Sequence, residues 1–178
     1  MQQKIVITGG PSTGKSTLIG ELSKRKYTCL EEISREVILE ARAQGIEHLF
    51  LTSPLLFSEI LLEKRTSQYK EATNTNSEIV FFDRGIIDII AYLNFSNTPY
   101  EIDFDVVLKD TKYQHVFICP PWKEIHKTDN ERYESFEQAL EIHEHLLFTY
   151  KEKGYDPIEI PFGTPKERCL FILKNSTN

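Results

Sequence analysis

The sequence contains no long run of apolar residues. None of its apolar segments approaches the roughly 18 consecutive residues that a membrane-spanning helix needs, although 40% of its 178 residues are hydrophobic. The opening residues, MQQKIVIT, are not followed by the apolar stretch of a secretion signal. We therefore expect a soluble, cytoplasmic protein with no membrane partner, in which the apolar residues build an internal core.

Cysteine is scarce and shows no pattern of a disulfide or metal site. The three cysteines, Cys29, Cys119 and Cys169, are far apart, odd in number and set among apolar residues, as small buried thiols are in a reducing compartment. There is no C-x-x-C pair, and His143 and His145 lie two residues apart, so they would point to different sides of a helix. These absences disfavour a disulfide framework and a structural zinc ion.

Positive charge is also in short supply. Lysine and arginine together number 21, against 27 aspartates and glutamates, so the formal net charge is −6. Without a diffuse basic surface, the binding of a polyanion depends on a local patch, and we expect no nucleic-acid partner. The sequence has no internal repeat, low-complexity tract or linker, and we therefore expect a single domain over residues 1–178.

What the sequence does contain is five short apolar runs separated by amphipathic segments. Apolar runs of roughly four to six residues that alternate with longer helical patterns are typical of a parallel sheet covered by helices. The predicted fold class is therefore α/β. The predicted strands are residues 4–8, 27–32, 78–83, 115–120 and 156–161. The predicted helices are residues 15–25, 32–44, 54–73, 85–95, 102–112, 131–153 and 164–174.

Several predicted helices carry their own boundary signals. Ser53-Pro54 is an N-cap followed by proline at the first helical position, and Gly154 follows the last turn of the long acidic helix. Thr164-Pro165 repeats the opening signal, and Glu167 occupies the third helical position, where a capping box places its carboxylate. These signals support the boundaries given above.

A glycine-rich turn near the N-terminus has the pattern of a phosphate-binding loop. Residues 9–16, GGPSTGKS, match G-x-x-x-x-G-K-[ST] in full, between a predicted strand and a predicted helix. Gly9 and Gly14 allow backbone angles that a side chain would forbid, so that successive N–H groups can point at phosphate oxygens. Lys15 is expected to reach the β- and γ-phosphates of a nucleoside triphosphate, and Ser16 to hold Mg²⁺. The predicted nucleotide-binding residues are Gly9, Gly10, Pro11, Ser12, Thr13, Gly14, Lys15, Ser16 and Thr17.

An aspartate at the end of the third predicted strand is the candidate second ligand of Mg²⁺. Asp83 closes the run EIVFFD and is the candidate Walker B acid beside Ser16; the alternative is that it only caps the next helix. Arg84 follows, where ligands bind in open α/β sheets, and its fork suits a phosphate or a substrate hydroxyl. The alternative for Arg84 is a structural ion pair with Asp83 or Asp88. Asp88 either binds a polar group of the acceptor or is solvated.

Two glutamates end the second predicted strand at the same edge of the sheet. Only one of Glu31 and Glu32 can point into the crevice, because side chains alternate along a strand. We favour Glu32, with Arg35 one turn on, as the acceptor of a proton from an attacking hydroxyl; the alternative is two solvated acids at a helix start. Arg132 is the predicted lid cation for the transferring phosphoryl group, with a charged surface loop as the alternative. The predicted catalytic residues are Lys15, Glu32, Asp83, Arg84 and Arg132.

In combination, five segments resemble the AAA-type P-loop ATPase family that includes the nicotinamide riboside kinase domain of NadR-type proteins. These segments are GGPSTGKST, EEISRE, FFDRGIIDIIAY, FICPPWKEIHKTDNERYESFEQALEIHEHL and GYDPIEIPFGTPKER, and they cover nearly the whole chain. The most specific parts are the DRG after the third strand and the PPW…D…ER…SF pattern of the fourth segment.

The resemblance implies a three-layer P-loop NTPase fold, with a five-stranded parallel sheet in the order 2-3-1-4-5 and helices on both faces. It implies that Asp83 and Arg84 occupy the position that nucleoside kinases place beside Mg²⁺ and the acceptor hydroxyl, and that Arg132 belongs to a short lid. Residues 161–165 then border the adenine. The chain is too short for the helical lid domain of ring-forming AAA machines, so we do not expect a hexameric motor.

Two functions fit these residues. The first is a kinase that transfers the γ-phosphoryl group of ATP to an unidentified, nucleoside-like small molecule, for which Tyr92, Tyr100 and Trp122 offer aromatic contacts. The alternative is a nucleotide-dependent switch or an ATPase or GTPase module that acts on a protein partner. The TDN string at 128–130 lacks the lysine of the N/T-K-x-D pattern typical of GTP binding, which favours ATP. A polynucleotide kinase is a weaker third option, and the oligomeric state is left open.

Overall fold

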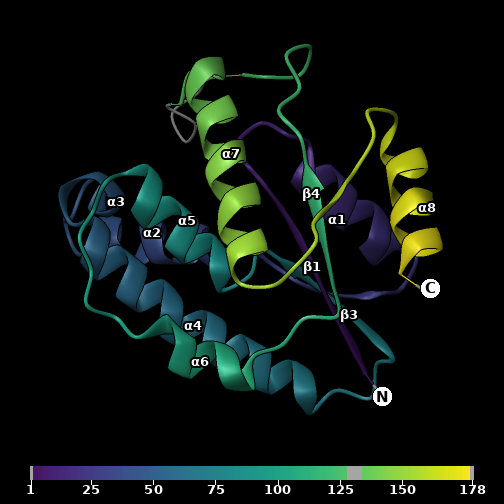
Figure 1. Ribbon diagram of the computed structural model, residues 1–178, viewed down its shortest axis with the longest axis horizontal. Helices are drawn as coiled ribbons and strands as arrows, with labels where there is room; N and C mark the ends of the chain where they lie inside the picture. The colour runs from purple at the N-terminus through teal and green to yellow at the C-terminus, as the bar shows by residue number, and fades with distance from the viewer. Residues whose placement is uncertain (1, 128–133, 177–178) are drawn as a thin grey trace.

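The computed structural model describes residues 2–127 and 134–176, and its architecture is a parallel sheet between two layers of helices (Figure 1). The sheet has five strands in the order β2-β3-β1-β4-β5, and all four neighbouring pairs are parallel. This confirms the predicted α/β class, the strand order 2-3-1-4-5 and the placement of helices on both faces. The strands are β1 (Gln3–Gly9), β2 (Thr28–Leu30), β3 (Ile79–Asp83), β4 (His115–Cys119) and β5 (Ile158–Glu159).

The helices divide between the two faces of the sheet. α1 (Lys15–Lys24) and α8 (Pro165–Asn175) pack together on one face. The opposite face is covered by the longer helices α4 and α7, with α2, α5 and α6 beside them (Figure 1). Their bounds are α2 (Ile33–Ala43), α3 (Leu49–Thr52), α4 (Pro54–Thr73), α5 (Ile87–Phe95), α6 (Phe104–Asp110) and α7 (Phe136–Glu152). No helix in the described residues is long and apolar enough to cross a membrane.

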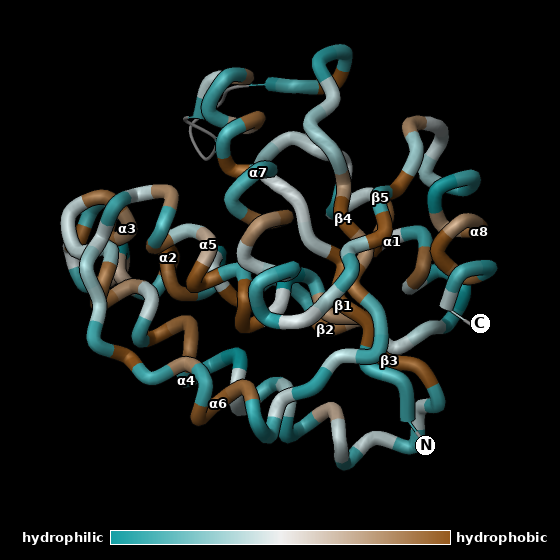
Figure 2. Tube along the Cα trace, in the orientation of Figure 1, coloured by the Kyte–Doolittle hydropathy of each residue, from teal (hydrophilic) through white to brown (hydrophobic). Residues whose placement is uncertain are grey.

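Alternation along the strands divides the core into two clusters. Val6 of β1 is level with Phe82 of β3 and Val116 of β4, and all three face the cluster under α2 and α4–α7. Ile7, the next residue along, is level with Phe117 and faces the cluster under α1 and α8. Because both faces are buried, the central strands are apolar throughout, which is typical of parallel sheets. The hydropathy trace shows these strands as the hydrophobic centre of the molecule (Figure 2).

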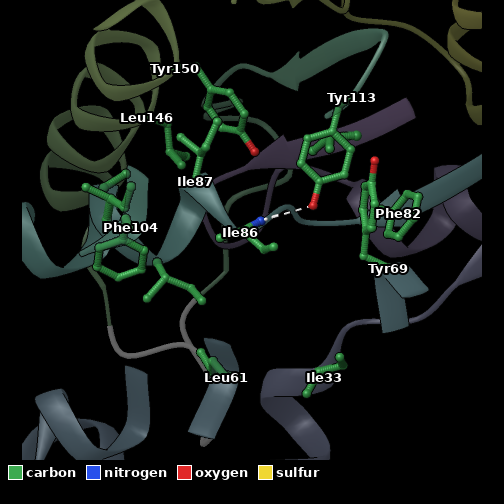
Figure 3. Packing of buried hydrophobic residues seen from close by; sticks show 14 of the residues in the cluster. Ile33, Leu61, Tyr69, Phe82, Ile86, Ile87, Phe104, Tyr113, Leu146 and Tyr150 are labelled. Carbon is green, nitrogen blue, oxygen red and sulfur yellow. Dashed lines mark hydrogen bonds between the residues drawn. The ribbon is translucent and has the colours of Figure 1, made fainter. Parts of the chain in front are cut away.

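An aromatic group in the larger cluster fixes the start of α5 (Figure 3). The rings of Tyr69, Phe82 and Tyr113 lie 5.5 to 5.9 Å apart between centroids. The Tyr113 hydroxyl oxygen accepts a hydrogen bond from the backbone N–H of Ile86 at 3.3 Å. This bond satisfies a buried N–H at the helix entry and holds the turn that follows β3.

The structure corrects several predicted boundaries. The strands at 27–32 and 156–161 are shorter than predicted, and the helices at 85–95 and 102–112 begin at Ile87 and Phe104. The short α3 lies in a segment expected to be a loop. The helix expected from 131 begins at Phe136, because Ser135 caps it with a full capping box; residues 131–133 lie outside the described residues. Ser53 occupies the N-cap of α4 but its side chain makes no capping hydrogen bond.

Candidate active site

The loop between β1 and α1 contains two glycines at which any other residue would strain the backbone or meet a close neighbour. Gly9 has φ of 143°, and a Cβ added there would lie 2.7 Å from the carbonyl oxygen of Cys119. Gly14 has φ of 79°, and its Cβ would lie 2.8 Å from Nη1 of Arg168. Both backbone angles fall where glycine alone is unstrained. The loop therefore packs tightly onto β4 and α8.

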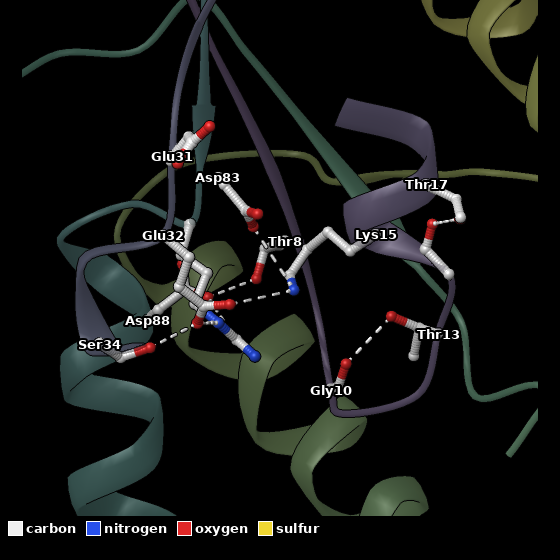
Figure 4. Close-up of polar contacts among 12 residues, drawn as sticks. Thr8, Gly10, Thr13, Lys15, Thr17, Glu31, Glu32, Ser34, Asp83 and Asp88 are labelled. Carbon is white, nitrogen blue, oxygen red and sulfur yellow. Dashed lines mark hydrogen bonds and ion pairs between the residues drawn. The ribbon is translucent and has the colours of Figure 1, made fainter. Parts of the chain in front are cut away.

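Local hydrogen bonds hold the loop in a concave shape (Figure 4). The Thr13 hydroxyl donates to the carbonyl oxygen of Gly10 at 3.0 Å, and the Thr17 hydroxyl donates to that of Gly14 at 2.7 Å. Gly14 caps α1 without a side-chain acceptor, so the first N–H groups of this helix are left for an anion. Ser16 is exposed in the first turn of α1. Pro11 is half-buried, and the Ser12 hydroxyl donates to the carbonyl oxygen of Lys127 at 2.7 Å.

Lys15 points from the start of α1 toward the ends of β2 and β3 (Figure 4). Its Nζ lies 3.4 Å from Oδ1 of Asp83 and 3.7 Å from Oε2 of Glu32. The side chain is only 6% exposed. Burial and the neighbouring Arg84 lower the pKa of Lys15, but the two carboxylates outweigh them and raise it above its usual value. The lysine is therefore held charged beside the phosphate-binding loop.

Arg84 contacts the Glu32 carboxylate from the side opposite Lys15. Its Nε donates to Oε1 of Glu32 at 2.5 Å, and its Nη1 donates to Oδ1 of Asp88 at 3.2 Å. The backbone of Arg84 is left-handed, with φ of 72°, and its N–H donates to the carbonyl oxygen of Ile7 at 3.0 Å. Burial lowers the pKa of Arg84, but the carboxylates around it, Glu32 first, raise it well above its usual value. The arginine is thus buried, charged and oriented from two sides.

Glu32 is the glutamate that faces Lys15 and Arg84, and Glu31 is exposed (Figure 4). The Ser34 hydroxyl donates to Oε1 of Glu32 at 2.8 Å. Burial alone would raise the pKa of Glu32, but Arg84 and Lys15 lower it well below its usual value. Burial raises the pKa of Asp83, although Lys15 opposes the shift. The two carboxylates are therefore held in different electrostatic environments although both contact the same lysine.

The structure brings Lys15, Glu32, Asp83 and Arg84 together, corrects one expectation and excludes two of the alternatives. Arg35, expected beside Glu32, is exposed, and Arg84 occupies that place. Asp83 does not cap the next helix, whose N-cap is Ile86. Asp88 is not solvated: it is 1% exposed and forms the ion pair with Arg84 that was the structural alternative. Arg132 lies outside the described residues.

Sequence reasoning missed Arg168 of α8. It is 3% exposed, and its Nη1 donates to the carbonyl oxygen of Thr13 at 3.0 Å. Its Nε and Nη2 have no hydrogen-bond partner among the described residues, and its guanidinium lies 5.8 Å from the ring centre of Trp122. Trp122 in turn packs on Phe162, with 4.9 Å between ring centroids. We call Trp122, Phe162 and Arg168 the aromatic platform; no local pattern joins positions so far apart in sequence.

The oxygen atoms near the loop suit a hard divalent cation. Oδ1 of Asp83 is buried and accepts no hydrogen bond from the described residues. Ser16 presents a hydroxyl at the first turn of α1. A Mg²⁺ ion prefers one or two protein oxygens together with phosphate oxygens and water. Asp83 and Ser16 therefore fit such an ion only when a phosphate group supplies the remaining ligands.

The chain matches one protein family over most of its length. Residues 4–168 match the family model described as an AAA domain. A search of curated proteins finds no match for the chain.

Several solved structures share the fold. Deoxyadenosine kinase from M. mycoides is 17% identical with a TM-score of 0.70, over 97% of this chain and 98% of that one. NadR in complex with NR is 20% identical with a TM-score of 0.74, over 99% of this chain and 50% of NadR, so this chain spans half of NadR. Thymidylate kinase from Candida albicans is 17% identical with a TM-score of 0.69, over 98% of this chain and 90% of that one.

Proposed function

This chain belongs to the AAA domain family, and we propose that it is a kinase that transfers the γ-phosphoryl group of ATP to a hydroxyl of a nucleoside-like small molecule. One observation carries the proposal: a continuous ion-pair network at the carboxyl ends of the central strands. In it Lys15 contacts Glu32 and Asp83, at 3.7 and 3.4 Å. Glu32 also contacts Arg84. A simple phosphate-binding loop needs only the lysine, whereas phosphoryl transfer needs groups on both sides of the γ-phosphate.

The phosphate-binding loop supplies the first half of the site. The backbone N–H groups of residues 9–16 would bind the β- and γ-phosphates, and Lys15 would move from its carboxylate partners to the phosphate oxygens. Ser16 and Asp83 would hold Mg²⁺, which when bound neutralises charge on the phosphates. The raised pKa of Lys15 supports this role, because a permanently charged lysine favours a polyanion over neutral ligands.

The acceptor side is built from Glu32 and Arg84. Glu32 would orient the acceptor hydroxyl, whose oxygen bonds to the γ-phosphorus as the bond to the β–γ bridging oxygen breaks and ADP leaves. The hydroxyl proton is released to solvent as the new bond forms, because the lowered pKa of Glu32 suits it to orienting the hydroxyl rather than to holding its proton. Arg84 would stabilise the charge on the phosphoryl oxygens during transfer. Catalysis in this scheme comes from positioning and electrostatics rather than from a covalent intermediate.

The likeness to nucleoside kinases supports a nucleoside-like acceptor. The matched structures include deoxyadenosine kinase and NadR in complex with NR, although the identities of 17% and 20% relate them to this chain by fold. Tyr92 supports the same assignment, since its ring lies 5.2 Å from the Arg84 guanidinium. An aromatic ring beside the arginine offers a flat, apolar contact for the sugar or base of the acceptor.

The aromatic platform is the proposed contact for the base of ATP. Phe162 is 55% exposed although it is a large apolar side chain, and it lies in the segment just before α8. Arg168 joins this platform to the phosphate-binding loop through Thr13. A purine stacks favourably on exposed aromatic rings and on a guanidinium plane. The platform thus extends the nucleotide site from the phosphates toward the base.

The proposal is tested by incubating the protein with ATP, Mg²⁺ and a panel of nucleosides that includes nicotinamide riboside. Formation of a phosphorylated nucleoside together with ADP is the expected result. ATP binding without any phosphorylated product would contradict the kinase and favour the nucleotide-dependent switch. Binding of ATP is measured in parallel by calorimetry, so that loss of binding and loss of transfer are separated.

Two variants distinguish the roles within this experiment. Lys15→Ala should abolish nucleotide binding or turnover, because the polyphosphate loses its main cation. Arg84→Ala should leave ATP binding within about threefold of wild type and lower transfer by about 10²- to 10³-fold. Lys24→Ala and Arg35→Ala, which remove exposed cations of the neighbouring helices, are the matched controls. Equal loss of binding in Arg84→Ala and Lys15→Ala would contradict a transfer-specific arginine.

A further inference from the structure

Asp88 of α5 is a fully buried carboxylate with a complete set of hydrogen-bond donors. It is 1% exposed. Its Oδ1 accepts from the Thr8 hydroxyl at 2.5 Å and from Nη1 of Arg84 at 3.2 Å. Its Oδ2 accepts from the backbone N–H of Gly85 at 2.9 Å and from the Tyr150 hydroxyl at 2.6 Å. Neither oxygen depends on water, because four protein donors satisfy both of them.

These donors come from separate parts of the fold. Thr8 immediately precedes the phosphate-binding loop, and the alternation of β1 turns its side chain to the same face as Val6, toward α5 and α7. Arg84 and Gly85 form the turn after β3, and Tyr150 lies on α7, the helix that follows residues 128–133. Figure 4 shows Asp88 beside Thr8 and Glu32. One carboxylate therefore fixes β1, the turn after β3 and α7 relative to one another.

Burying the charge of Asp88 costs folding free energy, which suggests that the carboxylate has a role beyond packing. A buried charge loses its hydration, and apolar side chains of similar volume often replace buried ion pairs without loss of stability. The rest of this cluster is strongly apolar, with Ile86, Ile87, Ile89 and Ile90 around Asp88 in the sequence. An apolar residue could accept none of the four hydrogen bonds, and the one of them that sets the direction of a charged side chain is the bond from Arg84.

The geometry of Arg84 explains how Asp88 acts. A guanidinium is planar and rigid, so fixing two of its nitrogens fixes the whole plane. Nη1 is held by Asp88 and Nε by Glu32, so the plane of the guanidinium is set by these two carboxylates. The Glu32 side chain is 15% exposed at the edge of the crevice, whereas that of Asp88 is 1% exposed. The contact with Asp88 therefore persists when ligands enter and compete for Glu32.

We propose that Asp88 is a positioning residue that aims the Arg84 guanidinium at the transferring phosphoryl group. The inference rests on the proposed kinase function for the identity of the target, and on the contacts above for the positioning itself. Asp88 touches neither substrate in this scheme and acts only through Arg84. Tyr150 and Gly85 hold Oδ2 so that Oδ1 keeps its direction.

The test is a double-mutant cycle with Asp88→Asn and Arg84→Ala. Asparagine keeps the shape of the side chain but removes its charge, and it places a donor where four donors already converge. We expect Asp88→Asn to lower kcat for transfer by about 100-fold while KM for ATP changes by less than about threefold, since a misplaced catalytic group costs rate before binding. In the Arg84→Ala background the same substitution should have no further effect on kcat, because Asp88 then has nothing to position. Asp156→Asn, an exposed carboxylate, is the matched control.

A second readout does not depend on transfer. The side-chain Nη1–H signal of Arg84, the donor that Asp88 holds, is assigned in a ¹⁵N spectrum by its loss in Arg84→Lys. It should exchange slowly with water in the wild type and at least about tenfold faster in Asp88→Asn. Tyr150→Phe removes one donor from Oδ2 and leaves Oδ1 in place, so it should change this exchange much less than Asp88→Asn.

The outcomes separate the two proposals. A wild type that phosphorylates no nucleoside contradicts the proposed function, and the Arg84 exchange then decides the positioning on its own. Unchanged exchange in folded Asp88→Asn overturns the positioning role. Full additivity of the two substitutions in kcat also overturns it, because it shows that Asp88 acts apart from Arg84.

Discussion

Asp83 is a single residue of the site whose charge lowers the stability of the fold. Its carboxylate is buried beside Lys15, and Oδ1 accepts no hydrogen bond from the described residues. Burial raises the pKa of Asp83. A carboxyl group whose folded pKa lies above its unfolded value stabilises the fold at low pH, and this contribution is lost as the pH rises through the folded pKa. At neutral pH the ionised Asp83 therefore lowers the free energy of unfolding.

The variant Asp83→Asn should consequently be more stable than the wild type when no ligand is bound. Removing the buried charge should raise Tm by about 2 to 4 °C, the shift that 1 kcal/mol produces in a domain of this size. The increase in Tm caused by ATP with Mg²⁺ should shrink at the same time. Differential scanning calorimetry at pH 7.5 measures both. Glu31→Gln, which neutralises an exposed acid nearby, should change neither; a lower Tm of free Asp83→Asn would mean that attraction to Lys15 outweighs burial.

Single residues were predictable where a local pattern fixes them. The glycines of the loop, Lys15 and Asp83 follow from one motif and one strand end. Alternation does not decide between the two glutamates, because β2 ends at Leu30 and Glu32 is the N-cap of α2. The contacts between distant segments were not predictable. Tyr150 and Asp88 are 62 residues apart, and Arg168 and Thr13 are 155 apart. No sequence period joins such positions, because only the closed fold brings them together.

At the scale of elements, the start of α7 matters for the site. The helix begins with a capping box, in which the Gln138 N–H donates to Oγ of Ser135 at 3.2 Å and the Ser135 N–H donates to Oε1 of Gln138 at 2.9 Å. The same helix packs on the phosphate-binding loop, since a Cβ on Gly10 would lie 3.6 Å from Cγ2 of Ile142. Fraying of its first turn would therefore loosen one wall of the loop.

Replacing Ser135 measures how much the N-cap of α7 stabilises the fold. Ser135→Ala should lower the free energy of unfolding by about 1 kcal/mol, because the Gln138 N–H at the helix start loses the hydroxyl oxygen that accepts its hydrogen bond. Ser135→Asn, which keeps a capping oxygen, should stay within a few tenths of a kcal/mol of wild type. Urea denaturation followed by circular dichroism provides the values. Equal stability of all three proteins would show that the cap is redundant.

Element boundaries were predicted best where a cap was recognised. Thr164 and Glu167 form the capping box that the sequence indicates, and the start of α8 is correct. Ser135 and Gln138 carry the same signal, but the polar residues before them also suit a helix, and the predicted start at 131 was wrong. The short β2 and β5 lie at the two edges of the sheet, where one neighbour is missing and a strand loses its pairing early.

At the scale of the whole molecule, a buried histidine links two elements and makes stability depend on pH. His143 of α7 lies 3.5 Å from Glu159 of β5, from Nε2 to Oε2. Burial lowers the pKa of His143, although Glu159 and Glu144 oppose the shift. A histidine whose pKa is lower in the folded than in the unfolded protein stabilises the fold at pH values above its unfolded pKa of about 6.5. This stabilisation is lost as the pH falls through that range.

The variant His143→Gln should therefore reduce the pH dependence of unfolding. Between pH 7.5 and 5 the wild type should lose more Tm than the variant, because only the wild type has to bury a protonated imidazole. His145→Gln, two residues further on the same helix, should retain the wild-type slope. Thermal scans across this range measure the difference, and a steeper slope in His143→Gln would mean that the pairing with Glu159 dominates over burial.

The sheet and its two cores were predictable at this scale, because five apolar runs separated by amphipathic helices leave few arrangements. The position of Trp122 on Phe162 was not, and it has a practical consequence. Trp122 is the only tryptophan in the chain, and it packs against Phe162 beside Arg168. The protein therefore carries its single tryptophan fluorophore at the proposed base contact. Its emission should be quenched when a purine nucleotide stacks there and should remain unchanged with inorganic triphosphate alone, so that occupancy of the base half of the nucleotide site is read from unlabelled protein.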